Sequence, residues 1–354
     1  MVTISLCMIV RDEEAVLDRC LASVRGLVDE IIVVDTGSID RTKKIAARYT
    51  ENIYDFVWKD DFAAARNESF SKATMNYCMW LDADDVFPDK EAQKFLAWKE
   101  HADGSADVVM MNYATGFDEE GNISFCYERE RLLKRKRRFQ WKGRVHEAIS
   151  ISGKVERLAV CIEHHSQKTS YGYRNLRIYE KMKEEGNTFS ARDLFYYARE
   201  LYYHKRYEEA VGCFNFFLER EDGFCENQVD ACRYLAYCLY QLGREKEALD
   251  ALYQGLHYRA PGGELCCDIG KHFMDRGMWE QAIFWYQGAL HAKKESTGGF
   301  LQKECYGYLP YLQLCVCYDR IGDREKAYQC HIMSGKYKPY GREFLKNKEY
   351  FHDL

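Results

Sequence analysis

The stretch YCMWLDADDVF, Tyr77 to Phe87, joins a strand-forming apolar run to a group of carboxylates. Asp82, Asp84 and Asp85 follow the apolar residues within four positions. Like charges repel each other and their desolvation costs free energy, so such a group at the end of a buried strand favours a bound cation. The Asp-x-Asp spacing of Asp82 and Asp84 suits Mg²⁺ or Mn²⁺ that bridges phosphates.

The residues before this stretch alternate between strand and helix patterns. Apolar runs at 3–10, 30–35 and 52–58 predict strands, and apolar residues at helical spacing lie between them. Strands separated by helices predict a parallel sheet with right-handed crossovers. Residues 106–162 show strand and turn patterns without long helices, which favours an antiparallel extension of the sheet.

Acidic side chains stand at the expected carboxyl ends of several strands, where ligands bind in open α/β sheets. Asp12 follows the first strand and Asp35 closes the second. Asp35 can accept hydrogen bonds from a ribose or a base edge, and its alternative role is that of a turn or helix-capping acid. The Gly-rich dinucleotide fingerprint, the Walker phosphate loop and the nucleotide loop of nucleotidyltransferases are all absent after Val10, which disfavours those classes.

The residues after about Leu176 have a helical pattern and contain an internal repeat. Its units are KRYEEAVGCF, GREKEALDAL, GMWEQAIFWY and GDREKAYQCH, and each contains an alanine at an equivalent position: Ala210, Ala248, Ala282 and Ala327. These alanines recur at intervals of roughly 34 to 45 residues, and a period near 34 built from helix pairs is typical of tetratricopeptide repeats. We therefore expect an α/β domain at 1–175 and an all-α domain of three to four repeats at 176–354.

Composition narrows the possible classes of protein. Apolar residues make up 47% of the 354 residues and charged residues 30%, which indicates a globular protein, and the net charge of -5 argues against a protein that coats nucleic acid. The sequence contains no run of roughly 18 apolar residues that could span a membrane. Its first residues lack the basic region of a signal peptide. The 15 cysteines lack the spacing of a zinc site, so reduced thiols in a cytoplasmic protein are expected.

Four ordered motifs, ISLCMIVRDEE, DEIIVVDTGSIDRT, DFAAARN and LDADD, resemble the nucleotide-sugar domain of family-two glycosyltransferases, which has the GT-A fold. The resemblance is dense over residues 1–90 and loose over 91–170. It implies an inverting transfer of a sugar from a nucleotide diphosphate donor, with uridine as the expected nucleoside. It also implies dependence on a divalent cation, Mn²⁺ or Mg²⁺.

The same resemblance assigns roles to individual residues of this chain. Asp35 would contact the nucleoside, with Arg66 and Asn67 close to it. Asp82 would face the ribose or the hydrated metal, and Asp84 would bind the metal directly. The other positions expected in the donor and nucleotide site are Val10, Asp12, Glu14, Gly37, Ser38 and Ala83.

A basic stretch, RERLLKRKRRFQWKGR at 129–144, offers cations for the leaving diphosphate. The run of basic residues at 134–138 is typical of a solvated hairpin tip. Arg131, on the strand before them, is therefore the better candidate to contact the diphosphate.

The segment GRVHEAI offers a candidate general base for the acceptor. Family-two enzymes often carry an acidic pair before a basic motif, and this chain has no obvious copy of it. It resembles the subset with a His-Glu pair followed by tetratricopeptide repeats. Glu147 is then the expected base and His146 an orienting or substrate-contacting residue. The alternative is that Glu147 forms an ion pair with a nearby arginine such as Arg144.

A pair of histidines, His164 and His165, follows the last expected strand. In this fold a histidine near the end of the domain often completes the metal shell. In the related subset that histidine lies shortly before a Gly-Tyr pair, whereas here several residues separate the two histidines from Gly172 and Tyr173. Both are candidate metal ligands, and a purely structural role is the alternative.

The repeats suggest the kind of acceptor, because tetratricopeptide grooves bind extended peptides or mediate self-association. The architecture is similar to bacterial S- and O-glycosyltransferases that modify cysteine or serine in small ribosomal peptides, as in glycocin biosynthesis. We expect a peptide or protein acceptor, and a homodimer is a further possibility. The alternatives are a saccharide or lipid-linked acceptor, or a repeat scaffold whose α/β domain has lost turnover.

Overall fold

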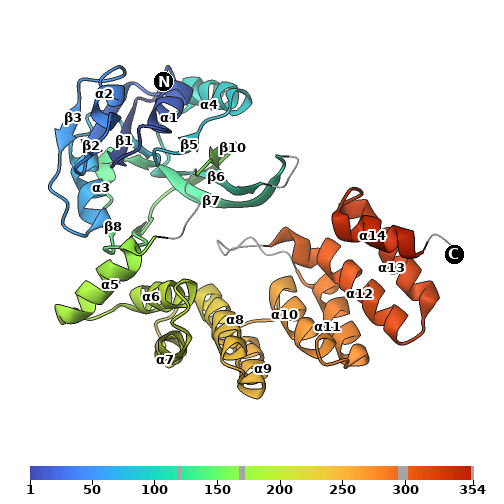
Figure 1. Cartoon of the computed structure of the whole chain (residues 1–354). Coiled ribbons are helices and arrows are strands. Elements are labelled where there is room, and N and C mark those ends of the chain that lie inside the picture. Colours follow the sequence, from blue (N-terminus) through green and yellow to red (C-terminus); the bar gives the residue numbers. More distant parts are fainter. Residues whose placement is uncertain (118–120, 167–171, 294–301, 352–354) are drawn as a thin grey trace. The chain divides into compact units, whose positions relative to one another are not determined.

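A computed structural model describes four segments of the chain, residues 1–117, 121–166, 172–293 and 302–351. The chain divides into two compact units, Met1–Asn187 and Thr188–Leu354, coloured blue to green and green to red in Figure 1. The first unit combines a mixed sheet with helices and the second is helical, which confirms the predicted fold class. Helix α5 (Arg174–Glu184) belongs to the first unit.

The first unit is built on an eight-stranded sheet with the strand order β3-β2-β1-β4-β7-β6-β10-β5. Its strands are β1 (Ile4–Val10), β2 (Glu30–Asp35), β3 (Ile53–Asp55), β4 (Tyr77–Trp80), β5 (Asp85–Val86), β6 (Val108–Phe117), β7 (Ile123–Lys134) and β10 (Val155–His164). A separate two-stranded sheet pairs β8 (Trp141–Lys142) with β9 (Ala148–Ile149).

The directions of the strands agree with most of what the sequence predicts. Strand β1 pairs in parallel with β2 and β4, and β2 pairs in parallel with β3, as the alternation of strands and helices predicts. Strand β7 is antiparallel to both β4 and β6, which agrees with the expected antiparallel extension. Strand β10 departs from that expectation because it pairs in parallel with β6.

The helices of the first unit before α5 are α1 (Leu17–Val24), α2 (Thr42–Ala46), α3 (Phe62–Ser71) and α4 (Asp89–His101), and η1 (Arg135–Arg137) is a short 3-10 turn. Helix α3 begins where the Asp61 carboxylate accepts a hydrogen bond from the Ala64 N–H at 2.8 Å, a standard N-terminal cap. This cap sets the start of the helix that carries Arg66 and Asn67.

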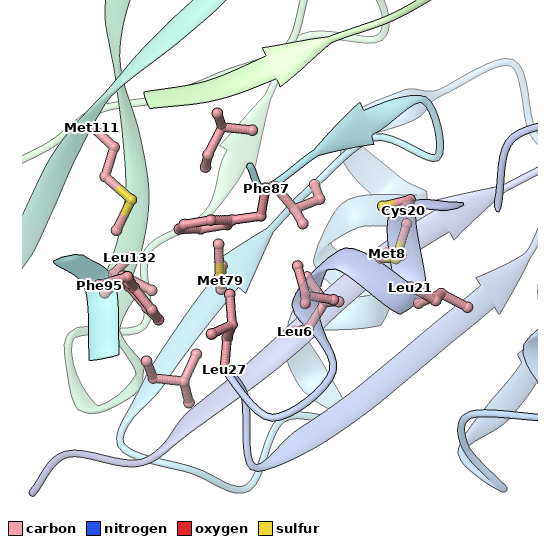
Figure 2. Packing of buried hydrophobic residues seen from close by; sticks show 14 of the residues in the cluster. Leu6, Met8, Cys20, Leu21, Leu27, Met79, Phe87, Phe95, Met111 and Leu132 are labelled. Carbon is pink, nitrogen blue, oxygen red and sulfur yellow. The ribbon is translucent and has the colours of Figure 1, made fainter. Parts of the chain in front are cut away.

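The hydrophobic core lies between the sheet and helices α1 and α4. Figure 2 shows Met79 and Phe87 in the middle of the cluster, with Leu21 of α1 on one side and Leu132 of β7 on the other. The buried residues of α1 recur at helical spacing, namely Leu17, Cys20, Leu21 and Val24. Burial of each such side chain stabilises the fold by about 1.5–3 kcal/mol.

The second unit consists of helix pairs (Figure 1). The pairs are α6 (Ala191–Tyr203) with α7 (Tyr207–Leu218), α8 (Cys225–Gln241) with α9 (Glu245–Gln254), α10 (Gly263–Met274) with α11 (Trp279–His291), and α12 (Tyr308–Arg320) with α13 (Arg324–Tyr337); α14 (Arg342–Tyr350) follows, and η2 (Gly255–His257) and η3 (Lys303–Tyr306) are short 3-10 turns. Within the described segments, no helix combines the length and apolar character needed to cross a membrane.

The repeat predicted from the alanines is confirmed. Each of the four alanines lies on the second helix of a pair and is fully buried: Ala210, Ala248, Ala282 and Ala327. In the last three pairs the turn between the helices contains a glycine with positive φ: Gly243, Gly277 and Gly322. A small residue at the crossing and a left-handed residue at the turn are therefore the features that each pair shares.

Candidate functional site

The candidate site lies at the carboxyl ends of β1, β2 and β4, which are neighbours in the sheet. Val10 ends β1 directly beside Asp35, the last residue of β2. The Val10 carbonyl accepts hydrogen bonds from the Thr36 N–H at 2.9 Å and the Thr36 hydroxyl at 3.1 Å. The loops that follow these strands therefore start from a fixed backbone.

Asp35 has one carboxylate oxygen in use and one free for a ligand. Its Oδ2 accepts hydrogen bonds from the N–H groups of Gly37 at 3.0 Å and Ser38 at 2.9 Å. Gly37 adopts φ 106°, a conformation that favours glycine. The Asp35 Oδ1 atom is buried and has no hydrogen-bond partner among the described residues. Buried acceptors are normally paired, so this oxygen suits a donor group of a ligand.

The loops after β1 and β2 are bonded to each other. The Asp12 N–H donates to Ser38 Oγ at 3.0 Å, and the Asp12 carboxylate accepts from the Ile39 N–H at 2.8 Å. The Glu14 carboxylate accepts from the backbone N–H and the Nε of Arg41, both at 3.0 Å. Asp12, Glu14 and Ser38 are thus brought together, and in this arrangement they shape the loops beside Asp35.

Arg66, on α3, connects two carboxylates that come from different parts of the chain. Its Nη2 donates to Asp82 Oδ1 at 2.8 Å and its Nε donates to Glu147 Oε1 at 2.5 Å. The Arg66 and Glu147 side chains are 9% and 11% exposed. Burial by itself would raise the pKa of Asp82, but the charge and hydrogen bond of Arg66 outweigh it and lower that pKa to about 2. Asp82 is therefore ionised throughout the physiological range.

Two tryptophans hold the Arg66 guanidinium in place. Its Cζ lies 5.0 Å from the Trp80 ring centroid and 4.9 Å from that of Trp141, within the range of cation–π interaction. Asn67 fixes Trp141, because its amide nitrogen donates to the Trp141 carbonyl at 3.0 Å and its amide oxygen accepts from the Trp141 N–H at 2.8 Å. Asn67 thus contacts the backbone of β8.

Among the residues that the structure describes, Asp84, Asp85 and His164 form a group that could hold a metal ion. One ligand atom from each lies within 4.8 Å of the others. His164 Nδ1 is 3.0 Å from Asp85 Oδ1 and 3.4 Å from Asp84 Oδ1. Burial by itself would lower the pKa of His164, but the hydrogen bond to Asp85 and the charges of the two carboxylates raise it. Burial and the charges of Asp82 and Asp85 raise the pKa of Asp84.

Both carboxylate oxygens of Asp85 already accept hydrogen bonds from protein donors. Its Oδ2 accepts from the Asp82 N–H at 3.0 Å and from Arg131 Nη1 at 3.2 Å. Its Oδ1 accepts from the Tyr113 hydroxyl at 2.7 Å. Asp84 and His164 are therefore the residues of this group best suited to contact a cation.

Arg131 lies beneath the strand ends, between two aromatic rings. Its side chain is 0% exposed, and its Cζ lies 3.9 Å from the Trp80 centroid and 4.1 Å from the Tyr113 centroid. In this structure Arg131 contacts Asp85 and the Trp80 carbonyl from inside the protein. Residues 134–138 lie at the opposite edge of the sheet, since Lys134 pairs with Tyr77 at the start of β4.

The other two histidines that the sequence analysis proposed for the site, His165 and His146, differ in their surroundings. His165 directs its ring to Glu163, with 2.9 Å between Nε2 and Oε2, and stacks on Phe117 at 4.8 Å. Its backbone N–H donates to the Asp84 carbonyl at 3.0 Å. His146 adopts φ 50°, a left-handed conformation in which histidine is enriched.

Glu147 does form the ion pair with an arginine that was the alternative to a catalytic role, but its partner is Arg66 and not Arg144. Arg144 Nη1 instead donates to Glu185 at 2.8 Å, and Glu147 pairs with Arg66. Ala83 was also expected in the donor site. Its side chain is 5% exposed and packs in the hydrophobic core.

The part of the chain that contains these strand-end acids is similar to a known protein family. Residues 5–153 match the model of glycosyl transferase family 2. The match confirms the predicted family resemblance for this part of the chain. The β1–β4 strand ends and the Asp35, Asp82 and Glu147 side chains all fall within the residues that match this model.

Curated relatives match parts of the chain. A TPR repeat-containing protein of Synechococcus elongatus is 53% identical over 85 residues, which cover 24% of this chain and 21% of the relative. The SPbeta prophage-derived glycosyltransferase SunS of Bacillus subtilis is 29% identical over 149 residues, which cover 41% of this chain and 34% of the relative. The chain thus spans between about a fifth and a third of the curated relatives it matches.

Solved structures similar to half of the chain include Pseudomonas aeruginosa pilF, with 15% identity and a TM-score of 0.39, covering 50% of this chain and 73% of that chain. They also include YrrB, described as a TPR protein with an unusual peptide-binding site, with 19% identity and a TM-score of 0.38, covering 50% and 82%.

Three aromatic residues of the first unit contribute to the site and were not predicted from the sequence. Trp80 and Trp141 enclose Arg66, and Tyr113 on β6 bonds to Asp85 and lies 2.9 Å from His164 Nδ1. The tryptophan next to the LDADD motif is the only local signal that could have suggested such a role.

Proposed function

We propose that this protein is a glycosyltransferase that moves a sugar from a nucleotide diphosphate donor, with UDP as the expected nucleotide, to a peptide or protein acceptor. The observation that carries the proposal is the unpaired Oδ1 of Asp35 at the carboxyl end of β2, beside the β4 end that leads to Asp82 and Asp84. Relatives that include the glycosyltransferase SunS support it.

The donor nucleotide would bind at the ends of β1 and β2. Asp35 Oδ1 would accept a hydrogen bond from the base or the ribose, which would satisfy an otherwise unpaired buried acceptor. The bonded loops that contain Asp12, Glu14 and Ser38 would enclose the nucleotide.

The charges of the site favour a divalent cation. The site contains more carboxylates than guanidinium groups. The guanidinium groups are those of Arg66 and Arg131, and the carboxylates are those of Asp82, Asp84, Asp85 and Glu147. A cation such as Mn²⁺ or Mg²⁺ held by Asp84 and His164 would stabilise the ionised form of Asp84, whose pKa is raised without it. When bound, it would supply positive charge to the leaving diphosphate.

Glu147 is the residue we assign as general base. It would take the proton of an acceptor hydroxyl or thiol while that atom attacks the anomeric carbon. The bond from the anomeric carbon to the diphosphate oxygen would break, the diphosphate would leave with the electron pair, and the configuration would invert. Glu147 and Asp82 share Arg66, so the proposed base and the donor side of the site are held by one side chain.

The helical repeats would select the acceptor, because paired-helix repeats commonly bind peptides. None of the 15 cysteines, all of which lie in the described segments, forms a disulfide in the structure. We therefore propose a reducing compartment, the cytoplasm, as the location.

The first experiment is calorimetric titration of UDP, and then GDP, with and without Mn²⁺. We expect UDP to bind in a Mn²⁺-dependent way. In the Asp84→Asn variant the dissociation constant should rise at least about 10-fold, since even the neighbours of metal ligands affect metal affinity by that much. Asp55→Asn is a matched control, because Asp55 also ends a strand but is 77% exposed and pairs with Lys43. Absence of nucleotide binding under every condition would contradict the proposal.

A second measurement addresses the acceptor. The UDP-sugar that binds best is offered with a peptide library and, separately, with oligosaccharides and lipid-linked saccharides. Labelled peptides would support the proposed acceptor, and transfer to saccharides alone would replace it with an envelope saccharide.

A further inference from the structure

The contacts of Arg66 go beyond those expected of a residue beside the nucleoside. Its Nε and Nη2 atoms lie on the same edge of the guanidinium, and they donate to Glu147 and Asp82, respectively. These carboxylates lie 81 and 16 positions from Arg66 along the chain. One planar group thus determines the separation and the direction of two acids from different loops.

We propose that Arg66 is a positioning residue that sets the proposed general base Glu147 relative to the donor-side carboxylate Asp82. The inference rests on the proposed function of Glu147. It adds that the base acts from a position imposed by the guanidinium, which couples the donor side of the site to the acceptor side.

The surroundings of Arg66 leave it little freedom to move. Trp80 and Trp141 lie at similar distances from its Cζ, and the two indoles contact each other edge to face with 5.2 Å between centroids. Arg66 Nη1 is buried without a hydrogen-bond partner among the described residues, so Nε and Nη2 make the hydrogen bonds of this side chain. A lysine at this position would keep the charge but not the two parallel N–H donors.

The test compares turnover in a double-mutant cycle. The release of UDP is measured for the fastest substrate among UDP-glucose, UDP-galactose and UDP-N-acetylglucosamine, with peptide mixtures or water as acceptor. Arg66→Lys should lower kcat by about 100-fold, because a displacement of about 1 Å in a catalytic group has effects of that size. In a Glu147→Gln background with saturating UDP-sugar, the same substitution should change kcat less than about 3-fold, because the position of the base no longer matters there and a weaker hold on Asp82 is expressed in KM for the donor.

Arg129→Lys serves as the matched control. Arg129 also lies over Trp80, at 4.7 Å, but it pairs with Glu130 instead of Glu147. It should change kcat much less than Arg66→Lys. UDP titration and thermal unfolding of each variant show whether the donor site and the fold are retained.

Each outcome has a distinct meaning. A 100-fold loss that persists in the Glu147→Gln background would overturn the positioning role and leave the base assignment intact. Full turnover in Glu147→Gln, with UDP binding retained, would instead remove Glu147 from the proposed function. If Arg66→Lys does not fold, Glu147→Asp replaces it: this variant keeps the carboxylate but withdraws it from Arg66, and an unchanged kcat would overturn the inference.

Discussion

At the scale of single residues, Arg131 shows how burial redirects a charge. Its Nη1 pairs with Asp85 and both side chains are 0% exposed. Two of its nitrogens, Nε and Nη2, have no hydrogen-bond partner within the described part of the chain, and the rings of Trp80 and Tyr113 lie against the guanidinium instead. Asp85 in turn accepts the Asp82 N–H, so this ion pair supports the turn that carries the Asp-x-Asp motif.

Substitution of Arg131 by methionine should therefore be strongly destabilising. It would leave the buried carboxylate of Asp85 without its cation, and removal of one partner from a buried pair costs about 3–5 kcal/mol. We expect the free energy of unfolding, measured by urea denaturation, to fall by that amount. Arg137→Met is the control, since Arg137 is 43% exposed and its substitution should change stability by less than about 0.5 kcal/mol. A loss below about 1 kcal/mol for Arg131→Met would contradict this interpretation.

At the scale of elements, the turn between α6 and α7 differs from the equivalent turns of the other helix pairs. Lys205 occupies the left-handed position, with φ 60°, where the following pairs have Gly243, Gly277 and Gly322. Its N–H donates to the Tyr202 carbonyl at 2.9 Å, the same type of bond that the other turns make. A side chain in this conformation costs roughly 1–2 kcal/mol relative to the right-handed region.

The Lys205→Gly variant should consequently be more stable than the wild type. We expect the free energy of unfolding to increase by about 1 kcal/mol, because glycine adopts positive φ without the steric cost but loses more chain entropy on folding. Gly243→Ala tests the same principle in the reverse direction and should be destabilising by about 1 kcal/mol. Urea denaturation of both variants is the measurement. A decrease in stability for Lys205→Gly would mean that the lysine side chain makes compensating contacts.

At the scale of the whole molecule, the two compact units have separate cores, since the sheet unit ends at Asn187 and the helical unit begins at Thr188. Independent cores generally unfold as separate cooperative transitions. The candidate site belongs entirely to the first unit. A ligand of that site should therefore stabilise one unit selectively.

Differential scanning calorimetry should show two transitions, only one of which responds to UDP with Mn²⁺. At a ligand concentration 100 times the dissociation constant, the stabilisation is about 2.7 kcal/mol, enough to raise that Tm by several degrees. The shift should disappear when Mn²⁺ is removed by a chelator, and it should be absent in Asp84→Asn. An equal shift of both transitions would contradict separate unfolding.

The sequence by itself determined the features that depend on local pattern. Alternating apolar runs and helical segments predicted the parallel strands β1 to β4, and the recurring alanines predicted the helix pairs. The strand-end acids were predicted as a group because the topology of a parallel sheet brings the ends of neighbouring strands to one edge. These properties follow from periodicity and from residues close together in the chain.

Only the tertiary structure decided which charged groups pair. Arg66 meets Glu147 across 81 positions and Arg131 meets Asp85 across 46, and no local pattern specifies either distance. The same holds for His164, which lies beside Asp85 because β10 pairs with β5, while the neighbouring His165 directs its ring to Glu163. Successive strand residues point to opposite sides, so the position and direction of a side chain depend on packing and register, which the linear sequence does not contain.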